Sequence, residues 1–302
     1  MAGQITLGSI PALLRPGIDE LISAYKDYPA QYKEWYDGRT SNMAWEVDVM
    51  VKLLGPAQFK QDGSSIYYDN MGQRWSQYYV HKNVAIGFII TSNAIRDNLY
   101  KSKFPMQQAA LKKSLLAFKE TLGAAVLNNG FDATNYPIGD GVALFSTAHP
   151  IDTGTVANTF VTQADLNETS LQDAINGIMR FRDQAGILGM FKAQKLGVPI
   201  DNQWVAKKLL GSVYEPGSGN NAINSMYDIL PGGYAVNTYL TDTNAWYVKT
   251  DADTGFKHFT RDPLEIDTME DFDTKSVKVS AVERYSFGVS DWRAGWGSSG
   301  VS

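Results

Sequence analysis

The stretch WEVDVMVKL, residues 45–53, divides strictly into two alternating sets of side chains. Trp45 and the aliphatic residues after it take every second position. Glu46, Asp48, Met50 and Lys52 take the positions between them. Successive side chains of a β-strand point to opposite faces, so this pattern predicts a strand with one apolar face.

A second β-rich run returns after a polar segment. Residues 58–72 are polar with Ile66 in the middle, and RWSQYYVHKNVAIGFIIT (74–91) is typical of a long strand. Strands of roughly 12–16 residues at about 3.3 Å per residue make an arm on the order of 40–50 Å long. Such an arm has no core of its own, so we expect it to contact another subunit. The candidate contact residues are Lys60, Tyr67, Tyr68, Arg74 and Trp75.

A long amphipathic helix is predicted directly after the arm. Ser92 and Asn93 suit its start, and Pro105 either kinks the helix or restarts it. Asn129-Gly130 predicts its end. The apolar stripe expected to face the core is Leu111, Leu115, Phe118, Leu122 and Val126, whereas Lys112, Lys113, Lys119 and Glu120 fall off it. A long arm followed by a long helix is unusual for an enzyme and natural for a building block.

The composition of the 302 residues describes an ordered protein with large contact surfaces. Hydrophobic residues make up 44%, and the 7 Trp and 16 Tyr favour buried interfaces. The lack of Cys excludes disulfides, thiol nucleophiles and cysteine metal sites. The N-terminal residues lack a signal-peptide pattern, and no apolar run approaches the roughly 18 residues of a membrane span. Aromatic residues crowd 25–36, so we expect this segment to be pinned onto the body.

The charges are unevenly spread along the chain. The net charge of −5 argues against broad nucleic-acid binding. Residues 92–128 carry six Lys/Arg and two acids, whereas residues 251–273 carry eight acids and two bases. Opposite patches permit head-to-tail contacts between copies, and two solvated faces explain the same charges equally well.

The segment 211–227 contains many small or amide residues and one charge, Glu215. Copies that meet at a symmetry axis would repel one another if they brought like charges there. A merely flexible loop has the same composition. The candidate axis residues are Gly217, Gly219, Asn220 and Asn221.

Catalytic and metal-binding patterns are weak. Ser146, His149 and Asp152 lie close together in STAHPID, but the members of a nucleophilic triad are set by spatial geometry, and no G-x-S-x-G elbow exposes Ser146. A hydrogen-bonded turn is the better interpretation of this loop, and a small serine hydrolase is the alternative from a different class. The three histidines form no metal-binding motif, so we expect no cofactor and no enzymatic activity.

Three blocks of the sequence resemble the Mu-like major head subunits of tailed bacteriophages. GDGVALFSTAHPIDTGTVAN (139–158) is similar to their D-G-x-x-L-F-x-x-x-H-P…G-x-x-x-N segment, and AVERYSFGVSDWRAGWGS (281–298) to their closing R-Y-x-x-x-x-x-D-W-R-x-x-x-G-S. Between them, LGVPIDNQWVAKKLLGS matches a strand followed by a helix, with Asn202-Gln203-Trp204 where an aliphatic residue is commoner. The likeness follows the same order along residues 45–300.

The resemblance implies an α+β phage capsid fold of the Hong Kong phage type. It implies an N-terminal arm over 1–44, an extended loop over 45–91 and a peripheral domain with a spine helix over 92–194. An axial domain would follow over 195–246, and 247–302 would return as strands and C-terminus. His149, Asp291, Trp292 and Arg293 are expected to be structural, with Trp292 buried and Arg293 paired to a carboxylate.

The function implied is a major capsid protein that self-assembles into an icosahedral shell of pentamers and hexamers. Portal, scaffold and decoration proteins are the implied partners, and the shell would enclose double-stranded DNA without sequence-specific binding. Assembly in the host cytoplasm and a final location in the virion are expected, with no membrane. An encapsulin-like compartment is the alternative with the same fold.

Overall fold

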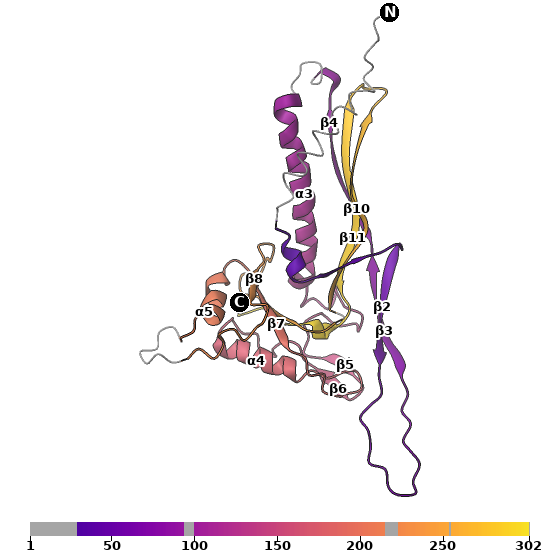
Figure 1. Ribbon diagram of the computed structural model, residues 1–302, viewed down its shortest axis with the longest axis vertical. Helices are drawn as coiled ribbons and strands as arrows, with labels where there is room; N and C mark the ends of the chain where they lie inside the picture. Colours follow the sequence, from indigo (N-terminus) through magenta and orange to yellow (C-terminus); the bar gives the residue numbers. More distant parts are fainter. Residues whose placement is uncertain (1–28, 94–99, 215–222, 254, 302) are drawn as a thin grey trace, which may run out of the picture.

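The computed structural model describes residues 29–93, 100–214, 223–253 and 255–301, with the backbone alone over 100–109. Figure 1 shows an elongated molecule whose narrow upper half holds α3 (Tyr100–Asn128) beside long strands. The wider lower half holds α4, α5 and the shorter strands, and a two-stranded arm descends on one side. None of the described helices has the length and apolarity to cross a bilayer.

The remaining elements follow in chain order. They are η2 (Gln31–Glu34), β1 (Asp37–Thr40), β2 (Trp45–Lys52), β3 (Gly72–Val80), β4 (Lys82–Ile90), β5 (His149–Ile151), β6 (Gly154–Val156), α4 (Glu168–Met179), β7 (Ala193–Val198), α5 (Gln203–Gly211), β8 (Tyr234–Val236), β9 (Trp246–Thr250), β10 (Phe256–Glu270), β11 (Val277–Val289), η3 (Trp292–Ala294) and β12 (Gly295–Ser298). Helices and strands are mixed, as the predicted α+β class requires.

The long sheet has the strand order β1-β10-β11-β4, and α3 covers one of its faces. Burial alternates along β11, where Val277, Val279 and Ala281 are buried and the residues between them are exposed. Leu111 and Leu115 of α3 pack against Ala281. The period of two in the strand therefore meets the helix on a single face. α3 continues through position 105 without interruption.

A second sheet, of order β12-β9-β7-β8, forms the main core together with α4 and α5. Leu171 and Ile178 of α4 belong to the same buried cluster as Leu196 of β7, Trp246 of β9 and Trp296 of β12. The residues on either side of the expected domain boundary at 194/195 therefore share one continuous hydrophobic core. Both α4 and the C-terminal strand pack with the segment assigned from the sequence to the axial domain.

Aromatic side chains hold the described part of the N-terminal segment on the body. Trp35 and Tyr36 are buried, and each meets Phe256 edge-on, with ring centroids 5.4 and 5.6 Å apart. The Tyr36 hydroxyl donates a hydrogen bond of 2.7 Å to the carbonyl of Gly123. The aromatic content of this segment thus serves its attachment, while residues 1–28 lie outside the described part of the chain.

The buried face of α3 departs from the predicted stripe beyond its middle. Phe118 is 48% exposed, whereas its neighbour Glu120 is buried together with Ala124 and Leu127. Lys119 Nζ lies 2.5 Å from Glu283 Oε2, and a Glu120 carboxylate oxygen accepts a hydrogen bond of 2.9 Å from the backbone of Tyr32. Burial raises the pKa of Glu120, and that backbone hydrogen bond opposes the rise. The prediction for Phe118 was wrong because Lys119 and Glu120 make their contacts with the body at this turn of the helix, and Phe118 faces outward.

The return strand predicted over 74–91 is two strands that belong to different sheets. β3 pairs with β2 in the arm, whereas β4 pairs with β11 in the long sheet. His81 separates them; its ring nitrogens lie 2.9 Å from Ser286 Oγ and 3.1 Å from Ser41 Oγ. Burial lowers the pKa of His81, which favours the neutral ring. The arm therefore joins the body at residues 41–44 and at His81.

The two faces of α3 predict different costs for two truncations on the same helix. Leu115→Ala should lower the free energy of unfolding by about 2–4 kcal/mol, because the side chain is buried against the sheet. Phe118→Ala should cost less than about 1 kcal/mol in the unassembled subunit. Denaturant unfolding of both variants measures the difference, and equal losses would show that the helix packs in another phase.

Candidate assembly interface

β2 and β3 pair antiparallel to form the arm. The register runs from Trp45 opposite Val80 to Lys52 opposite Gly72, with an irregularity between Val49 and Val51. Because residues that are directly opposite share a face, the register sorts the arm into two faces. The outer face is mainly apolar and consists of Trp45, Val47, Val49, Tyr78 and Val80.

The inner face of the arm lies against its own chain through polar contacts. Asp48 forms an ion pair with the buried Lys257 of β10 and accepts a hydrogen bond from Ser290 Oγ. The Tyr79 hydroxyl lies 2.5 Å from the same Ser290 oxygen, and its ring packs 5.0 Å from that of Phe259. Burial raises the pKa of Tyr79, so the hydroxyl stays neutral. The arm turns its polar side inward.

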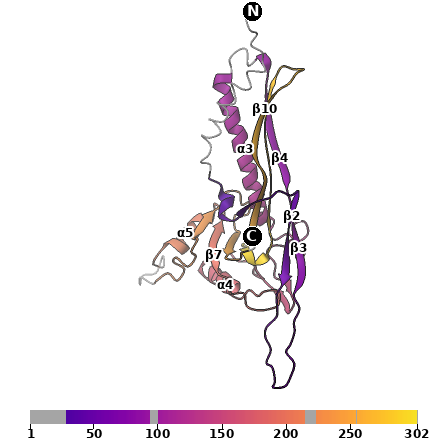
Figure 2. The same cartoon turned by 45° about the vertical axis from the view of Figure 1, so that its right-hand side comes forward.

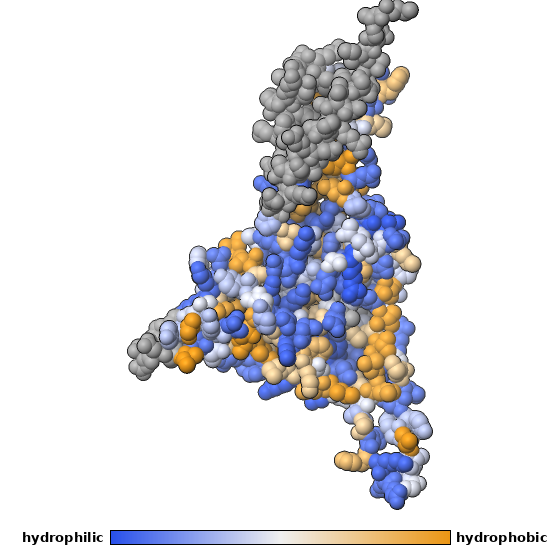
Figure 3. Space-filling view, viewed as in Figure 1, coloured by the Kyte–Doolittle hydropathy of each residue, from blue (hydrophilic) through white to orange (hydrophobic). Residues whose placement is uncertain are grey.

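The outer face is left open by the described part of the chain. Trp45, Tyr78 and Val80 are 52%, 59% and 61% exposed. Figure 3 shows apolar surface along the arm at the right-hand side of the molecule. Complete burial of one such side chain is worth about 1.5–3 kcal/mol. An arm with its apolar side outward is a surface built for a partner.

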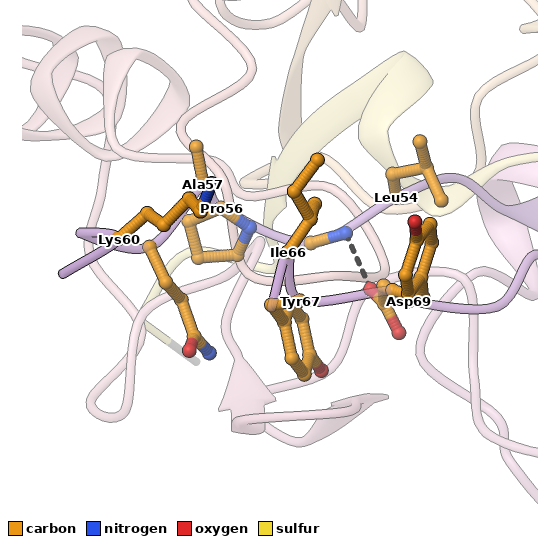
Figure 4. A pocket seen from close by; sticks show the side chains of 10 residues that line it. Leu54, Pro56, Ala57, Lys60, Ile66, Tyr67 and Asp69 are labelled. Carbon is orange, nitrogen blue, oxygen red and sulfur yellow. Dashed lines mark hydrogen bonds between the residues drawn. The ribbon is translucent and has the colours of Figure 1, made fainter. Parts of the chain in front are cut away.

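The loop between the strands projects beyond the body of the subunit. In Figures 1 and 2 it hangs below the β5–β6 hairpin as an open loop. Its two limbs are joined by a hydrogen bond of 2.7 Å from the Gly55 amide to Asp69 Oδ2, drawn as the dashed line in Figure 4. Lys60, Tyr67 and Tyr68 line the hollow between the limbs, and all three are exposed. The loop adds Leu53, Leu54, Phe59, Ile66 and Met71 as further exposed apolar residues.

Arg74 and Trp75, two of the expected interface residues, also contact their own chain. Arg74 forms an ion pair with Asp152 in the β5–β6 turn, and Lys52 Nζ lies 3.0 Å from the other oxygen of that carboxylate. Trp75 packs on the main core, so that a Cβ added to Gly139 would come within 2.5 Å of its ring. These contacts of Lys52, Arg74 and Trp75 form a clasp that holds the middle of the arm on the body. The sequence pattern contains no sign of the core that lies beneath it.

The clasp changes the titration of its charged groups. The hydrogen bond from Lys52 holds the pKa of Asp152 below its ordinary value of 3.8, and the same bond raises the pKa of Lys52. At Asp69 the Gly55 amide is the main cause of a lowered pKa. Each carboxylate is therefore ionised throughout the physiological range.

The four residues expected nearest a symmetry axis, Gly217, Gly219, Asn220 and Asn221, lie outside the described residues. The bases of that loop are described. Tyr214 and Ile223 form an isolated antiparallel bridge, and both are exposed. The placement of this loop on an axis stays a prediction.

Ser146, His149 and Asp152 are not brought together as a triad. The buried His149 ring has Nδ1 2.7 Å from Asp140 Oδ2 and Nε2 3.0 Å from Asn158 Oδ1, which leaves no ring nitrogen for Ser146. Asp152 is held in the clasp described above. In the part of the chain that the structure describes, no three His, Cys, Asp or Glu side chains are grouped to hold a metal. The loop is a hydrogen-bonded turn without the geometry of a hydrolase.

Asn158 joins the two sequence blocks that are far apart in the chain. Its Nδ2 donates to the carbonyl oxygens of Leu144, Trp292 and Gly295 at 2.7, 3.1 and 3.2 Å. The ring of His149 stacks on that of Trp292 with centroids 4.6 Å apart. Asp140 and Asn158 belong to this network but were not among the residues predicted from the sequence. Both stand in the quoted D-G…H-P…N segment, and that spacing was the available signal.

Trp292 and its neighbours hold the other side of this network. Trp292 is fully buried, and Arg293 Nη1 lies 2.9 Å from Asp291 Oδ1. Arg293 Nε also donates a hydrogen bond of 2.7 Å to the carbonyl of Arg182. The Asp-Trp-Arg triplet thus ties the end of β11 to the loop after α4.

The comparisons with known proteins decide the family. The model described as phage capsid protein matches residues 76–297, which is most of the chain. The chain belongs to the phage capsid protein family. It is a structural subunit of a phage head, as the resemblance predicted. The search of curated proteins gives no match.

Solved capsid structures share the fold of this phage capsid protein. The procapsid of bacteriophage JBD30 superposes with a TM-score of 0.54 at 16% identity, over 97% of this chain and 76% of that chain. The capsid of Myoviridae phage XM1 gives 0.52 at 10% identity, over 87% and 89%. A virus-like particle from Pyrococcus furiosus gives 0.51 at 10% identity, over 94% and 97%. The predicted capsid fold is confirmed.

The network predicts a large effect for one buried amide of the phage capsid protein. Asn158→Ala should lower the free energy of unfolding by about 4 kcal/mol, because it leaves several buried donors and acceptors unpaired at about 1–3 kcal/mol each. Asn135→Ala, at an exposed asparagine, is the control and should cost less than about 1 kcal/mol. Urea unfolding of the unassembled subunit tests both, and a small loss at Asn158 would contradict the structural role of the network.

The clasp predicts a pH dependence for the arm. Because the pKa of Asp152 is depressed in the folded chain, its contribution is complete above the ordinary carboxyl pKa and is lost as pH falls through the depressed value. Lys52→Gln should therefore raise the pKa of Asp152. Lys60→Gln, in the same loop, should leave it unchanged. NMR titration of labelled aspartate carboxyl carbons measures both, and an unmoved Asp152 pKa in Lys52→Gln would disprove the clasp.

Proposed function

We propose that this phage capsid protein forms the icosahedral shell of a tailed phage by laying its arm on a neighbouring subunit. The shell would consist of pentamers and hexamers of this chain and enclose double-stranded DNA. The observation that carries the proposal is the open apolar outer face of an arm whose polar face is anchored to its own chain.

The anchors divide the arm into a fixed base and a free end. Asp48 and Tyr79 hold the base, and the clasp at Asp152 holds the middle. Among the described residues, the loop beyond residue 52 has its own internal contacts and the ion pair of Lys52 with Asp69, and no other. Lys60, Tyr67 and Tyr68 are proposed to meet the neighbour there, since all three are exposed, and the two tyrosines have few rotatable bonds and so lose little entropy on burial.

The proposed partners follow from the role as a shell subunit. Portal, scaffold and decoration proteins are proposed to bind the assembled form, and assembly is proposed to occur in the host cytoplasm before the shell becomes part of the virion. The likeness to the Pyrococcus furiosus particle supports an encapsulin-like compartment as a second candidate of the same fold. Nucleic acid inside the purified native particles supports the phage shell, and protein cargo supports the compartment.

Polar substitutions on the outer face test the role of the arm. Val49→Thr with Tyr78→Thr keeps β-forming residues in both strands and should leave the unassembled subunit folded. Shell formation should need at least about tenfold more protein, because each lost apolar contact is worth about 1 kcal/mol or more and 1.4 kcal/mol is a factor of ten. Light scattering and electron microscopy over a concentration series measure the threshold.

The matched control uses the same residue types on other surfaces. Val161→Thr with Tyr136→Thr changes an exposed valine and an exposed tyrosine outside the arm. This variant should assemble at the threshold of the unchanged protein. Equal thresholds for all three proteins would refute the proposed contact of the arm.

A further inference from the structure

The turn that joins β10 to β11 presents a phenyl ring on a rigid frame. Phe272 at its apex is 82% exposed. The Asp271 amide donates to the Ser276 carbonyl at 2.8 Å, and the Lys275 amide donates to the Asp271 carbonyl at 2.9 Å. Lys275 adopts a left-handed φ of 55°, which fixes the turn. A large apolar side chain is thus held in solvent by a preorganised backbone.

Acidic residues flank this ring. Asp271 is paired with Lys278 at 2.6 Å, whereas Glu270 and Asp273 have no cationic partner within the described chain. The turn therefore combines one aromatic ring, which has Lys275 Nζ 4.1 Å from its centroid, with two carboxylates, those of Glu270 and Asp273, that have no ion pair among the described residues. We name residues 270–275 the acidic knob.

A groove at the other end of the subunit has the complementary chemistry. It lies between the β5–β6 hairpin and the end of α4, and its volume is about 390 Å³. Its apolar lining includes Ile151, Val156 and the Trp296 ring, which packs on Gly177 so closely that a Cβ there would come within 2.4 Å. The groove therefore offers an apolar floor for a side chain.

Two guanidinium groups stand at the rim of this groove. Arg180 and Arg182 are exposed, and no carboxylate of the described chain lies within ion-pair distance of either. Arg182 is held in place by a hydrogen bond of 2.7 Å from Nη1 to the Gly186 carbonyl. The groove is thus apolar within and basic at its edge, which is the inverse of the acidic knob.

The knob and the groove cannot meet within one subunit. Figure 1 places the turn after β10 at the top of the molecule and the β5–β6 hairpin near the bottom. We infer that the acidic knob of one copy inserts Phe272 into the groove between β5–β6 and α4 of a second copy, where Arg180 and Arg182 pair with Glu270 and Asp273. The inference rests on the proposed assembly and names a second contact besides the arm.

The complementarity sets the direction of the contact. Burial of the ring stabilises the complex, and charge pairing selects the orientation. Because knob and groove are different surfaces of one chain, the contact is head to tail and repeats from copy to copy. The acidic side of this contact lies in the acid-rich segment 251–273, whereas its basic side, Arg180 and Arg182, lies outside the basic segment 92–128.

Disulfide trapping tests the contact directly, since the chain has no cysteine of its own. Thr155→Cys with Thr274→Cys places one thiol at the groove and one on the knob, and a disulfide forms only when the Cα atoms come within about 7 Å. Oxidised shells should then give a ladder of linked subunits on a non-reducing gel. Thr155→Cys with Thr243→Cys, an exposed threonine elsewhere, is the control and should give none.

The outcomes separate this inference from the proposed function. Shells that form without a ladder, or with equal ladders for both pairs, overturn the knob-and-groove contact and leave the shell function intact. Absence of any shell from the unchanged protein overturns both. Charge exchange gives an independent measurement: Arg180→Glu and Asp273→Arg should each weaken assembly roughly threefold to tenfold, and their combination should restore it. Failure of the combination to recover would count against the pairing.

Discussion

The period of two in a β-strand governs this subunit. A strand that carries an apolar set and a polar set must present them on opposite faces, and here the polar set is used for attachment to the body. Asp48 pairs with the buried Lys257, and the ring of Tyr79 packs against Phe259 on the body. The apolar set on the opposite face of the same strands must therefore face outward. The need for a partner is therefore created by how the arm is anchored.

The anchor works because the body beneath it is held by a buried polar network. Asn158 binds three carbonyl groups from two distant segments, and His149 stacks on Trp292 in the same place. Buried amides with every group satisfied fix one arrangement, whereas apolar contacts alone tolerate several. The segments with the D-G…H-P…N and D-W-R residues are thus fastened into one rigid unit. Weak contacts between subunits can then add up, since each presents the same geometry.

Local patterns in the sequence predicted much of this structure, and contacts between distant segments account for the rest. The alternation at Trp45 gave the first strand of the arm, and the resemblance of three blocks gave the fold. The phase of α3 failed at Phe118, because no local pattern shows that Lys119 will find Glu283 far along the chain. The break of the predicted strand at His81 was missed for a related reason, since β3 and β4 have similar compositions but pair with strands of different sheets. Asp140 and Asn158 both bind the ring of His149, and this shared contact becomes apparent only in the folded structure.

The junction of the arm has a consequence for how one sequence fills sites that are not geometrically identical. The arm is joined to the long sheet through residues 41–44 and His81. The Ser41 amide still donates to the Thr260 carbonyl at 3.0 Å, and neither residues 42–44 nor His81 belong to the register of either ladder. A change in the angle of the arm would therefore disturb side-chain contacts and leave both ladders intact. Five-fold and six-fold rings demand different angles between neighbours. If the shell contains both rings, as proposed, the subunit would adapt by exchanging the side-chain contacts of Asp48 and Asp152 while its secondary structure stays the same.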